Sequence, residues 1–450
     1  MKVTRFRRLC LSGLIGLLLV ILTTCASNRS ESTTPTPVES LVQPLGITLI
    51  FWHAWPSPEQ HALATLVDRY NQDHPLTQVM LQAMPVASLT RELRMASQVG
   101  SGPHLVLLQS HTITGLARDE VLLALDGETL ADVVPDDDLL STAMEGVWAS
   151  DQAGNRQVYG VPLAFDTLGL YYNKRRVEVP PKDTDALLRD AHALTNPAQQ
   201  PPVWGLAYTL SVDKTVGYLP AFGGQVLDTN GQVVLGASGR AGSEQWLTWL
   251  LQLRQDEAIL AIPDSITVES VLQAQAALIT IDWSRSLPQY RALWGDDLGV
   301  ALLPRVAQTN QAAQPYVQSD VLSINRQSVD AEEQAAALDF MRYLLSVESQ
   351  QLLLEAGRQP TRLSLNLEGT TVEMEAARVF REQAQQGLPM PHLGTVADMA
   401  REEIERMQIT VLRGLATPAD AVTQSDAALH NRLPEAAISP QPVAPASPIP

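Results

Sequence analysis

Tryptophans stand beside polar side chains at two places where an apolar run of the chain ends. Trp52 and Trp55 close the segment ITLIFWHAW, with His53 between them. Asp282 and Trp283 lie at the end of the segment ALITIDWS. An indole offers a flat apolar face to the C–H groups of a ring, while carboxylates, amides and arginines bind hydroxyl groups. This combination is typical of a binding site for a small polar ring compound.

Alternation along a strand separates the first two tryptophans. Because successive strand side chains point to opposite faces, Trp52 and His53 cannot share a face. We predict that one tryptophan belongs to the core and that Trp55 faces a ligand, with Trp52 as the second candidate.

Two aspartates admit an enzymatic interpretation. Asp166 ends the apolar segment VYGVPLAFD, and with Asp282 it could form the acid and base pair of a secreted glycoside hydrolase. However, the sequence contains no G-x-S-x-G elbow, no H-E-x-x-H motif and no phosphate-cradling loop, and its eight histidines are scattered. We therefore predict that the chain is not an enzyme and uses no cofactor or metal.

The first residues have the form of an export signal. Four basic residues precede the apolar run Leu9 to Leu22, which is shorter than the roughly 20 residues of a spanning helix, and Cys25 follows closely.

Cys10 and Cys25 are the only cysteines, so the body after the signal can form no disulfide. Removing the four positive charges of the signal takes the formal net charge from -18 to -22. Such a charge disfavours nucleic acid as a partner.

The body between two Pro-rich ends alternates strand-like and helix-like segments, which predicts an α/β protein. Ala26 to Pro44 predicts a flexible tether, and Pro434 to Pro450 a disordered tail. Ser57 is the predicted cap of the helix that follows the first strand. Asp330 and Glu333 predict a capping box on a later helix.

Eight segments in order resemble the family of extracellular solute-binding proteins typified by the maltose-binding protein. The resemblance spans about Ile47 to Leu429 and includes ITLIFWHAW, LATLVDRYNQDHP, GSGPHLVLL, VYGVPLAFDTLGLYYNKRRV, AFGGQVLDTNGQVVLGASG, AALITIDWS, LGVALLPR and the long block that begins SDVLSIN. One departure is His104, where the family often has Asp.

Leu22 to Cys25 also resembles the lipobox of bacterial lipoproteins, although Thr24 stands where Gly, Ala or Ser is usual. This implies a lipidated Cys25 that holds the protein outside the cytoplasmic membrane or in the periplasm. Ordinary cleavage near Ala26 is the alternative.

The family resemblance implies a two-lobe periplasmic-binding-protein (type II) fold with discontinuous lobes and a hinge, in a monomer that delivers a sugar to the permease subunits of an ABC importer. GVPLAFD and LGVALLP would be the crossings between the lobes. The implied organisation is a signal peptide at 1–24, a lipid-anchored linker at 25–45, a first lobe at 46–163 and 305–340, a second lobe at 164–304 and 341–432, and a Pro-rich tail at 433–450.

The resemblance also implies ligand contacts. Asp166 would be a polar contact in the first crossing, with a turn-capping role as the alternative. Trp283 would stack on a sugar ring, and Asp282 would lie beside it. Arg358 and Arg362 would reach the cleft or pair with surface acids. The family's glycine-bearing loop beside the cleft corresponds to Phe222, Gly223 and Gly224.

Ligand identity stays open. Polyamines, peptides and ferric iron remain alternatives. Ferric iron is considered because Tyr171 and Tyr172 are adjacent, as the iron ligands are in ferric-binding relatives. A place in the interlobe strand also explains the two tyrosines. A polyamine site would need more carboxylates than the two placed in the cleft. A solute sensor that docks on a receptor kinase would have the same lobes as an importer component.

Overall fold

The computed structural model describes residues 46–134 and 138–433. The predicted signal peptide, Cys25, the linker and the tail from residue 434 onward lie outside the described residues. Among those described, no helix is both long enough and apolar enough to cross a membrane.

The first sheet is mixed and has seven strands in the order β13-β6-β12-β3-β1-β2, with β14 paired to β12. β1 runs parallel to β2 and β3, whereas β12 runs antiparallel to β3 and β6. The strands are β1 Ile47–His53, β2 Thr77–Ala83, β3 Leu105–Gln109, β6 Val161–Asp166, β12 Tyr316–Ile324, β13 Gln359–Pro360 and β14 Leu388–Pro389.

The second sheet has five strands in the order β11-β7-β10-β8-β9. Here β7 is antiparallel to both of its neighbours, and β8 is parallel to β9 and β10. The strands are β7 Leu168–Asn173, β8 Trp204–Thr209, β9 Ile259–Ile262, β10 Ala277–Trp283 and β11 Leu298–Ala301. A separate hairpin pairs β4 Trp148–Ser150 with β5 Arg156–Val158.

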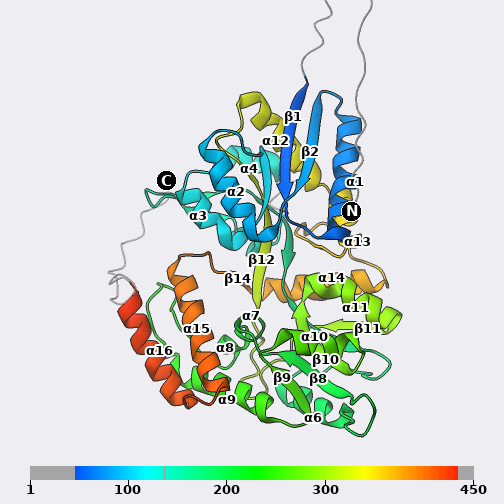
Figure 1. Ribbon diagram of the computed structural model, residues 1–450, viewed down its shortest axis with the longest axis vertical. Coiled ribbons are helices and arrows are strands. Elements are labelled where there is room, and N and C mark those ends of the chain that lie inside the picture. The colour runs from blue at the N-terminus through cyan, green and yellow to red at the C-terminus, as the bar shows by residue number, and fades with distance from the viewer. Residues whose placement is uncertain (1–45, 135–137, 434–450) are drawn as a thin grey trace, which may run out of the picture. The chain divides into compact units, whose positions relative to one another are not determined.

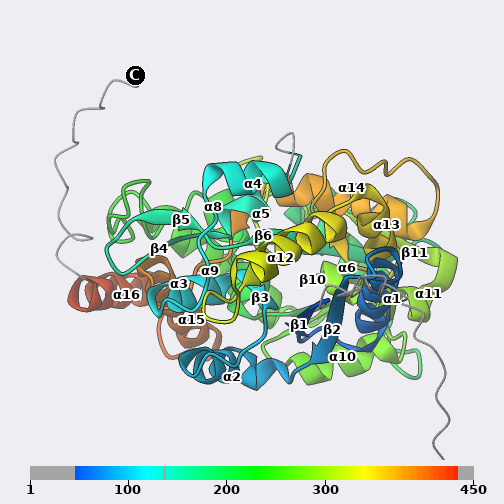
Figure 2. The same cartoon turned by 90° about the horizontal axis from the view of Figure 1, so that it is seen from above.

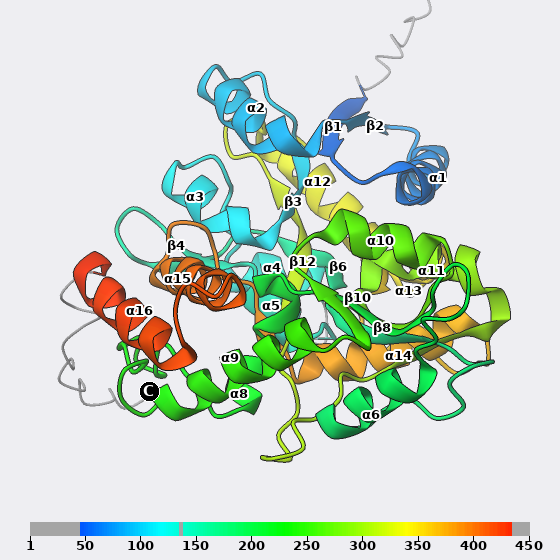
Figure 3. The same cartoon turned by 60° about the horizontal axis from the view of Figure 1, so that its bottom comes forward.

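Helices cover both sheets and form two groups (Figure 1). α12 packs against β1 (Figure 2), while α15 and α16 pack against each other and against α9 (Figure 3). The first group is α1 Ser57–Asp73, α2 Val86–Gln98, α3 Ile113–Arg118, α4 Gly127–Val133, α5 Ser141–Glu145, α12 Ala331–Leu344 and α13 Val347–Glu355. The second group is α6 Thr184–Leu194, α7 Val212–Thr215, α8 Tyr218–Ala221, α9 Arg240–Gln255, α10 Ser265–Gln273, α11 Leu287–Trp294, α14 Val372–Gln385, α15 Val396–Leu412 and α16 Pro418–Arg432.

Helix capping follows the sequence at one of the two predicted places. Asp330 and Glu333 form the predicted capping box on α12, which satisfies backbone N–H groups of its first turn. Ser57 is already the first helical residue of α1, and the N-cap is the extended Pro56, which makes no side-chain capping bond. The predicted Ser57 cap is therefore wrong.

Each sheet has its own apolar core. Leu49, Phe51 and Leu63 lie in the first core, and Trp246 and Ile279 lie in the second. The first core also includes the following residues of α12, its C-terminal end and α13: Met341, Leu344, Leu345 and Leu353. The predicted lobe boundary after residue 340 falls inside α12, and the lobe limits stay a prediction.

One of the passages of the chain between the sheets is a short polar connection. Between β6 and β7 only Thr167 intervenes, and it is fully buried. Its backbone N–H donates to the side-chain oxygen of Ser284 at 3.2 Å, and the backbone N–H of Ser284 donates to the carbonyl of Thr167 at 2.7 Å. These bonds join the β6–β7 crossing to the end of β10, beside the cavity described next.

Candidate ligand-binding site

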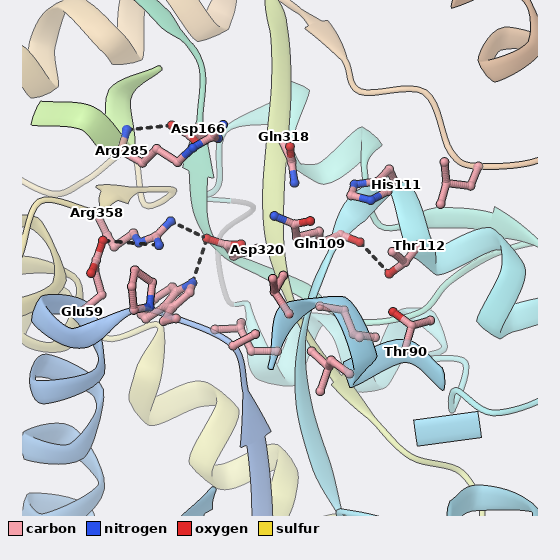
Figure 4. A pocket seen from close by; sticks show the side chains of 18 residues that line it. Glu59, Thr90, Gln109, His111, Thr112, Asp166, Arg285, Gln318, Asp320 and Arg358 are labelled. Carbon is pink, nitrogen blue, oxygen red and sulfur yellow. Dashed lines mark hydrogen bonds and ion pairs between the residues drawn. The ribbon is translucent and has the colours of Figure 1, made fainter. Parts of the chain in front are cut away.

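A cavity of about 570 Å³ opens where the C-terminal ends of β1, β3 and β6 meet β12 and the end of β10 (Figure 4). Its volume is in the range of small-molecule sites. The lining residues are Ala54, Trp55, Pro56, Glu59, Val86, Leu89, Thr90, Leu107, Leu108, Gln109, His111, Thr112, Asp166, Arg285, Gln318, Asp320, Arg358 and Leu393.

One wall is a charged cluster around Trp55. The indole Nε1–H of Trp55 donates to Oδ2 of Asp320 at 3.0 Å, and Arg358 donates to the same oxygen at 3.1 Å. A second guanidinium nitrogen of Arg358 lies 3.4 Å from Oε1 of Glu59. The guanidinium carbon lies over the Trp55 ring, 4.7 Å from its centre. All four residues are at most 9% exposed, so the cluster is shielded from bulk water.

Local backbone features aim these side chains. Trp55 follows β1 in a turn in which its N–H donates to Nδ1 of His53 at 3.1 Å. Asp320 lies where the pairing of β12 with β6 shifts register, an irregularity that re-aims side chains. Arg358 comes directly after Gly357, whose φ of 93° ends α13 in a conformation that only glycine adopts without strain.

Burial controls the protonation of Asp320. Desolvation raises the pKa of the Asp320 carboxyl above its usual range, and the positive charge of Arg358 opposes that rise. Among the groups that oppose this rise, Arg358 has the largest effect in favour of the ionised form.

The second charged group of the wall comes from the crossing between the sheets. Asp166 ends β6 and accepts hydrogen bonds from Ser284 Oγ, the backbone N–H of Arg285 at 2.9 Å and the Arg285 guanidinium. The Arg285 guanidinium also lies over the ring of Trp283, 4.6 Å from its centre. Asp166 therefore fixes Arg285 at the cavity edge.

The opposite wall is polar but uncharged at neutral pH. Gln109, Thr112 and Gln318 line it together with His111 (Figure 4). Burial lowers the pKa of His111, and the nearby positive charge of Arg401 lowers it further. A neutral His111 beside amide and hydroxyl groups offers donors and acceptors suited to hydroxyl groups.

Three of the residues predicted to bind ligand line this cavity, namely Trp55, Asp166 and Arg358. Trp52, Asp282, Trp283, Phe222, Gly223 and Gly224 are not among the lining residues. The role of each of these residues in ligand binding stays a prediction.

The structure gives the residues outside the lining other contacts. Trp52 Nε1–H donates to Gln82 on β2 at 2.9 Å. Asp282 pairs with Lys214 at 2.6 Å and accepts from the Tyr290 hydroxyl at 2.8 Å. Trp283 is 7% exposed.

Two further predicted features lie elsewhere in the fold. Phe222 packs against Trp249, while Gly223 has a φ of 83° in the turn after α8. Arg362 pairs with Asp138 at 3.0 Å instead of lining the cavity.

Neither tyrosine of the adjacent pair lines the cavity. Tyr171 is fully buried, and its hydroxyl donates to the backbone carbonyl of Trp283 at 2.8 Å. Within residues 46–134 and 138–433, no group of three or more His, Cys, Asp or Glu side chains is placed to hold a metal ion.

His104, the departure from the family pattern, serves the first sheet. Its Nδ1 accepts from the backbone N–H of Ile50 at 2.9 Å, and its Nε2 lies 3.5 Å from Glu333. It does not line the cavity.

Sequence reasoning missed Glu59, Asp320 and Arg285. A carboxylate within the buried segment YVQSDVLSI was a usable signal for Asp320, since buried charges are rare unless paired or functional. Glu59 looks like an ordinary acidic residue in the first turn of a helix. The sequence does not show that Glu59 meets Arg358.

Fold and cavity together define a two-lobe α/β binding protein for a small molecule. Residues 65–379 match the family of bacterial extracellular solute-binding proteins. The chain belongs to this family. Family membership confirms the predictions of a binding protein, of an exported chain and of a non-enzymatic role.

Known relatives agree with this assignment. A maltotriose-binding protein of Pyrococcus abyssi is 26% identical over 180 residues, which cover 40% of this chain and 37% of that protein. The unliganded and acarbose-bound GacH receptor of Streptomyces glaucescens has a TM-score of 0.71 and 19% identity, covering 86% of this chain and 98% of its own. The maltotriose-bound maltose/maltodextrin-binding domain MalE of Bdellovibrio bacteriovorus has a TM-score of 0.66 and 21% identity, covering 86% and 99%. These similarities confirm the predicted two-lobe fold.

Proposed function

We propose that this protein captures an oligosaccharide outside the cytoplasm and delivers it to an ABC importer. The observation that carries the proposal is the pairing in one cavity of a buried tryptophan, Trp55, with charged and amide side chains. The ring C–H groups of a sugar pack on an indole, and its hydroxyls bond to carboxylates, guanidinium groups and amides. The relatives whose names include maltotriose or maltose support a glucan as the first ligand to test.

The ligand screen is a thermal-shift assay on the purified full-length chain. Maltose, maltotriose and maltotetraose are compared with a polyol, putrescine, a tripeptide and ferric iron. A ligand at about 100 times its Kd stabilises the native state by roughly 2.7 kcal/mol, which raises Tm measurably. A shift with the oligosaccharides alone supports the proposal, and a shift with putrescine, peptide or iron alone contradicts it.

We also propose that a lipid on Cys25 attaches the protein to the membrane. The protein is proposed to act as a monomer. The change Cys25→Ser removes the thiol that would be acylated. We expect the unchanged chain to sediment with membranes and to incorporate labelled palmitate, and the variant to do neither. Equal sedimentation of both forms, without label, would contradict lipidation.

Delivery to permease subunits is tested by uptake. We expect cells that lack this chain to lose uptake of radiolabelled maltotriose, and expression of the unchanged chain to restore it. If uptake persists while a transcriptional response to the sugar is lost, the protein acts as a sensor instead.

A further inference from the structure

The charged cluster around Trp55 does not balance its own charges. Glu59 is 5% exposed and Asp320 9% exposed, and both contact the single guanidinium of Arg358. With both carboxyl groups ionised, they and the one guanidinium leave one negative charge in a wall shielded from water. Buried charges are costly unless they are paired.

The hydrogen bonding of the cluster is incomplete in the same place. Oε2 of Glu59 is buried and has no hydrogen-bond partner among the described residues, and the same holds for Nε of Arg358. The contact from Arg358 to Glu59 Oε1, at 3.4 Å, is longer than that to Asp320 at 3.1 Å. Glu59 is therefore the less well compensated carboxylate. The N-terminal turn of α1 supplies about half a positive charge at most, which leaves the cluster negative.

The other charges of the cavity are already balanced. Asp166 is paired with Arg285 and accepts two further hydrogen bonds, from Ser284 Oγ and the Arg285 backbone. His111 has a lowered pKa and is neutral at pH 7. The excess negative charge thus lies on the side of Glu59 and Asp320, next to the tryptophan on which a sugar ring would pack.

We propose that the ligand carries one ammonium group, held by Glu59 and Asp320, and is therefore an amine-bearing sugar. This inference rests on the proposed sugar-binding function and narrows its substrate class. A single positive charge cancels the single excess, and an ammonium donates hydrogen bonds to carboxylate oxygens that lack partners. A linear polyamine brings two or more separated charges, for which the described lining offers no second uncompensated carboxylate.

Calorimetric titration of the full-length chain at about pH 6.5 tests the proposal with matched ligands. Glucosamine, which carries one amine, is compared with glucose and with N-acetylglucosamine, its acetylated form; maltotriose and putrescine complete the set. We expect the free amine to improve affinity about tenfold over the neutral counterpart. Acetylation removes the charge, so we expect it to abolish the gain.

The variant Glu59→Gln assigns the preference to the cluster, because it keeps the shape of the side chain and removes its charge. We expect the ratio of the affinities for the amine-bearing and the neutral sugar to fall about tenfold in this variant. Glu355→Gln removes the same charge from an exposed position on α13 and is expected to change neither affinity.

Several outcomes would overturn the inference. One is that neutral sugars bind at least as tightly as their amine counterparts. Another is that maltotriose binds and no amine-bearing sugar does. Both results would leave the proposed function intact. An equal loss for both ligand classes in Glu59→Gln would also overturn it. Binding of putrescine alone would overturn the proposed function as well.

Discussion

The guanidinium of Arg358 covers one face of the Trp55 indole at 4.7 Å from the ring centre, while the indole N–H and the guanidinium share one oxygen of Asp320. A ligand ring can therefore pack only on the opposite face of Trp55. Cation–π contact and shared hydrogen bonding fix the plane of the indole before any ligand arrives, which lowers the entropic cost of binding.

Loss of Arg358 should destabilise the fold strongly. Arg358→Met leaves Glu59 and Asp320 buried without their cation, and removing one partner of a buried pair costs about 3–5 kcal/mol. Urea unfolding monitored by circular dichroism measures this loss.

A matched control comes from another arginine that stacks on a tryptophan. Arg156 lies over Trp148 at 4.9 Å, but its ion pair with Glu145 is exposed. We expect Arg156→Met to cost no more than about 1 kcal/mol. Similar losses in both variants would show that the charged cluster is not a special source of stability.

Asp320 should impose a stability penalty that grows with pH. Because burial raises the folded-state pKa of Asp320 above its usual value near 3.8, the folded state holds the proton over a range in which the unfolded state has released it. Its contribution to stability is therefore present below about pH 4 and is lost as pH rises through the folded-state pKa. We expect the Tm of Asp320→Asn, measured relative to that of the unchanged chain, to increase as pH rises from about 4 to 7. A difference in Tm that stays constant over this range would contradict the prediction.

His392 should make the protein sensitive to acid. Its Nε2–H donates to the carbonyl of Gly146 at 3.1 Å, so its Nδ1 accepts from Thr114 at 2.6 Å in the neutral ring. Burial lowers the His392 pKa, so below about pH 6.5 the unfolded state takes up a proton that the folded state resists. Its contribution is present above that pH and is lost as pH falls.

We expect the Tm of the unchanged chain to fall more steeply between about pH 7 and 5 than that of His392→Gln. The exposed His61 on α1 supplies the control His61→Gln, which should follow the unchanged chain. Parallel pH curves for all three proteins would refute a role of His392.

Asp166 should act through Arg285. Its two oxygens accept three hydrogen bonds, all from Ser284 and Arg285. Asp166→Asn cannot accept all of these, and we expect a loss of stability of about 1–3 kcal/mol in urea unfolding. An unchanged free energy of unfolding would show that these bonds do not stabilise the crossing.

The fold could be predicted from local signals, because strands, helices and the capping box of α12 follow from periodicity and capping residues that lie close together in the sequence. The site could be predicted only in part. Trp55 and Trp283 look alike in the sequence, as tryptophans at strand ends near polar residues. Only the structure shows that Trp283 lies outside the cavity lining, with Arg285 stacked on its ring.

Long-range pairing explains what was missed. Trp55 and Asp320 are 265 positions apart, and their meeting depends on the pairing of β12 beside β3 and β6. The sheet that α12 and α13 cover is a similar case, since both helices look amphipathic but their sequence does not state which sheet they pack against.

Calorimetric titration of maltotriose into the unchanged chain and into the variants Trp55→Ala and Trp148→Ala tests sugar binding in this cavity most directly. We expect saturable binding with one ligand per chain, a loss of affinity of at least about tenfold, or 1.4 kcal/mol, in Trp55→Ala, and no change in Trp148→Ala. Binding that survives Trp55→Ala unchanged, or no binding of any oligosaccharide to the unchanged chain, would contradict it.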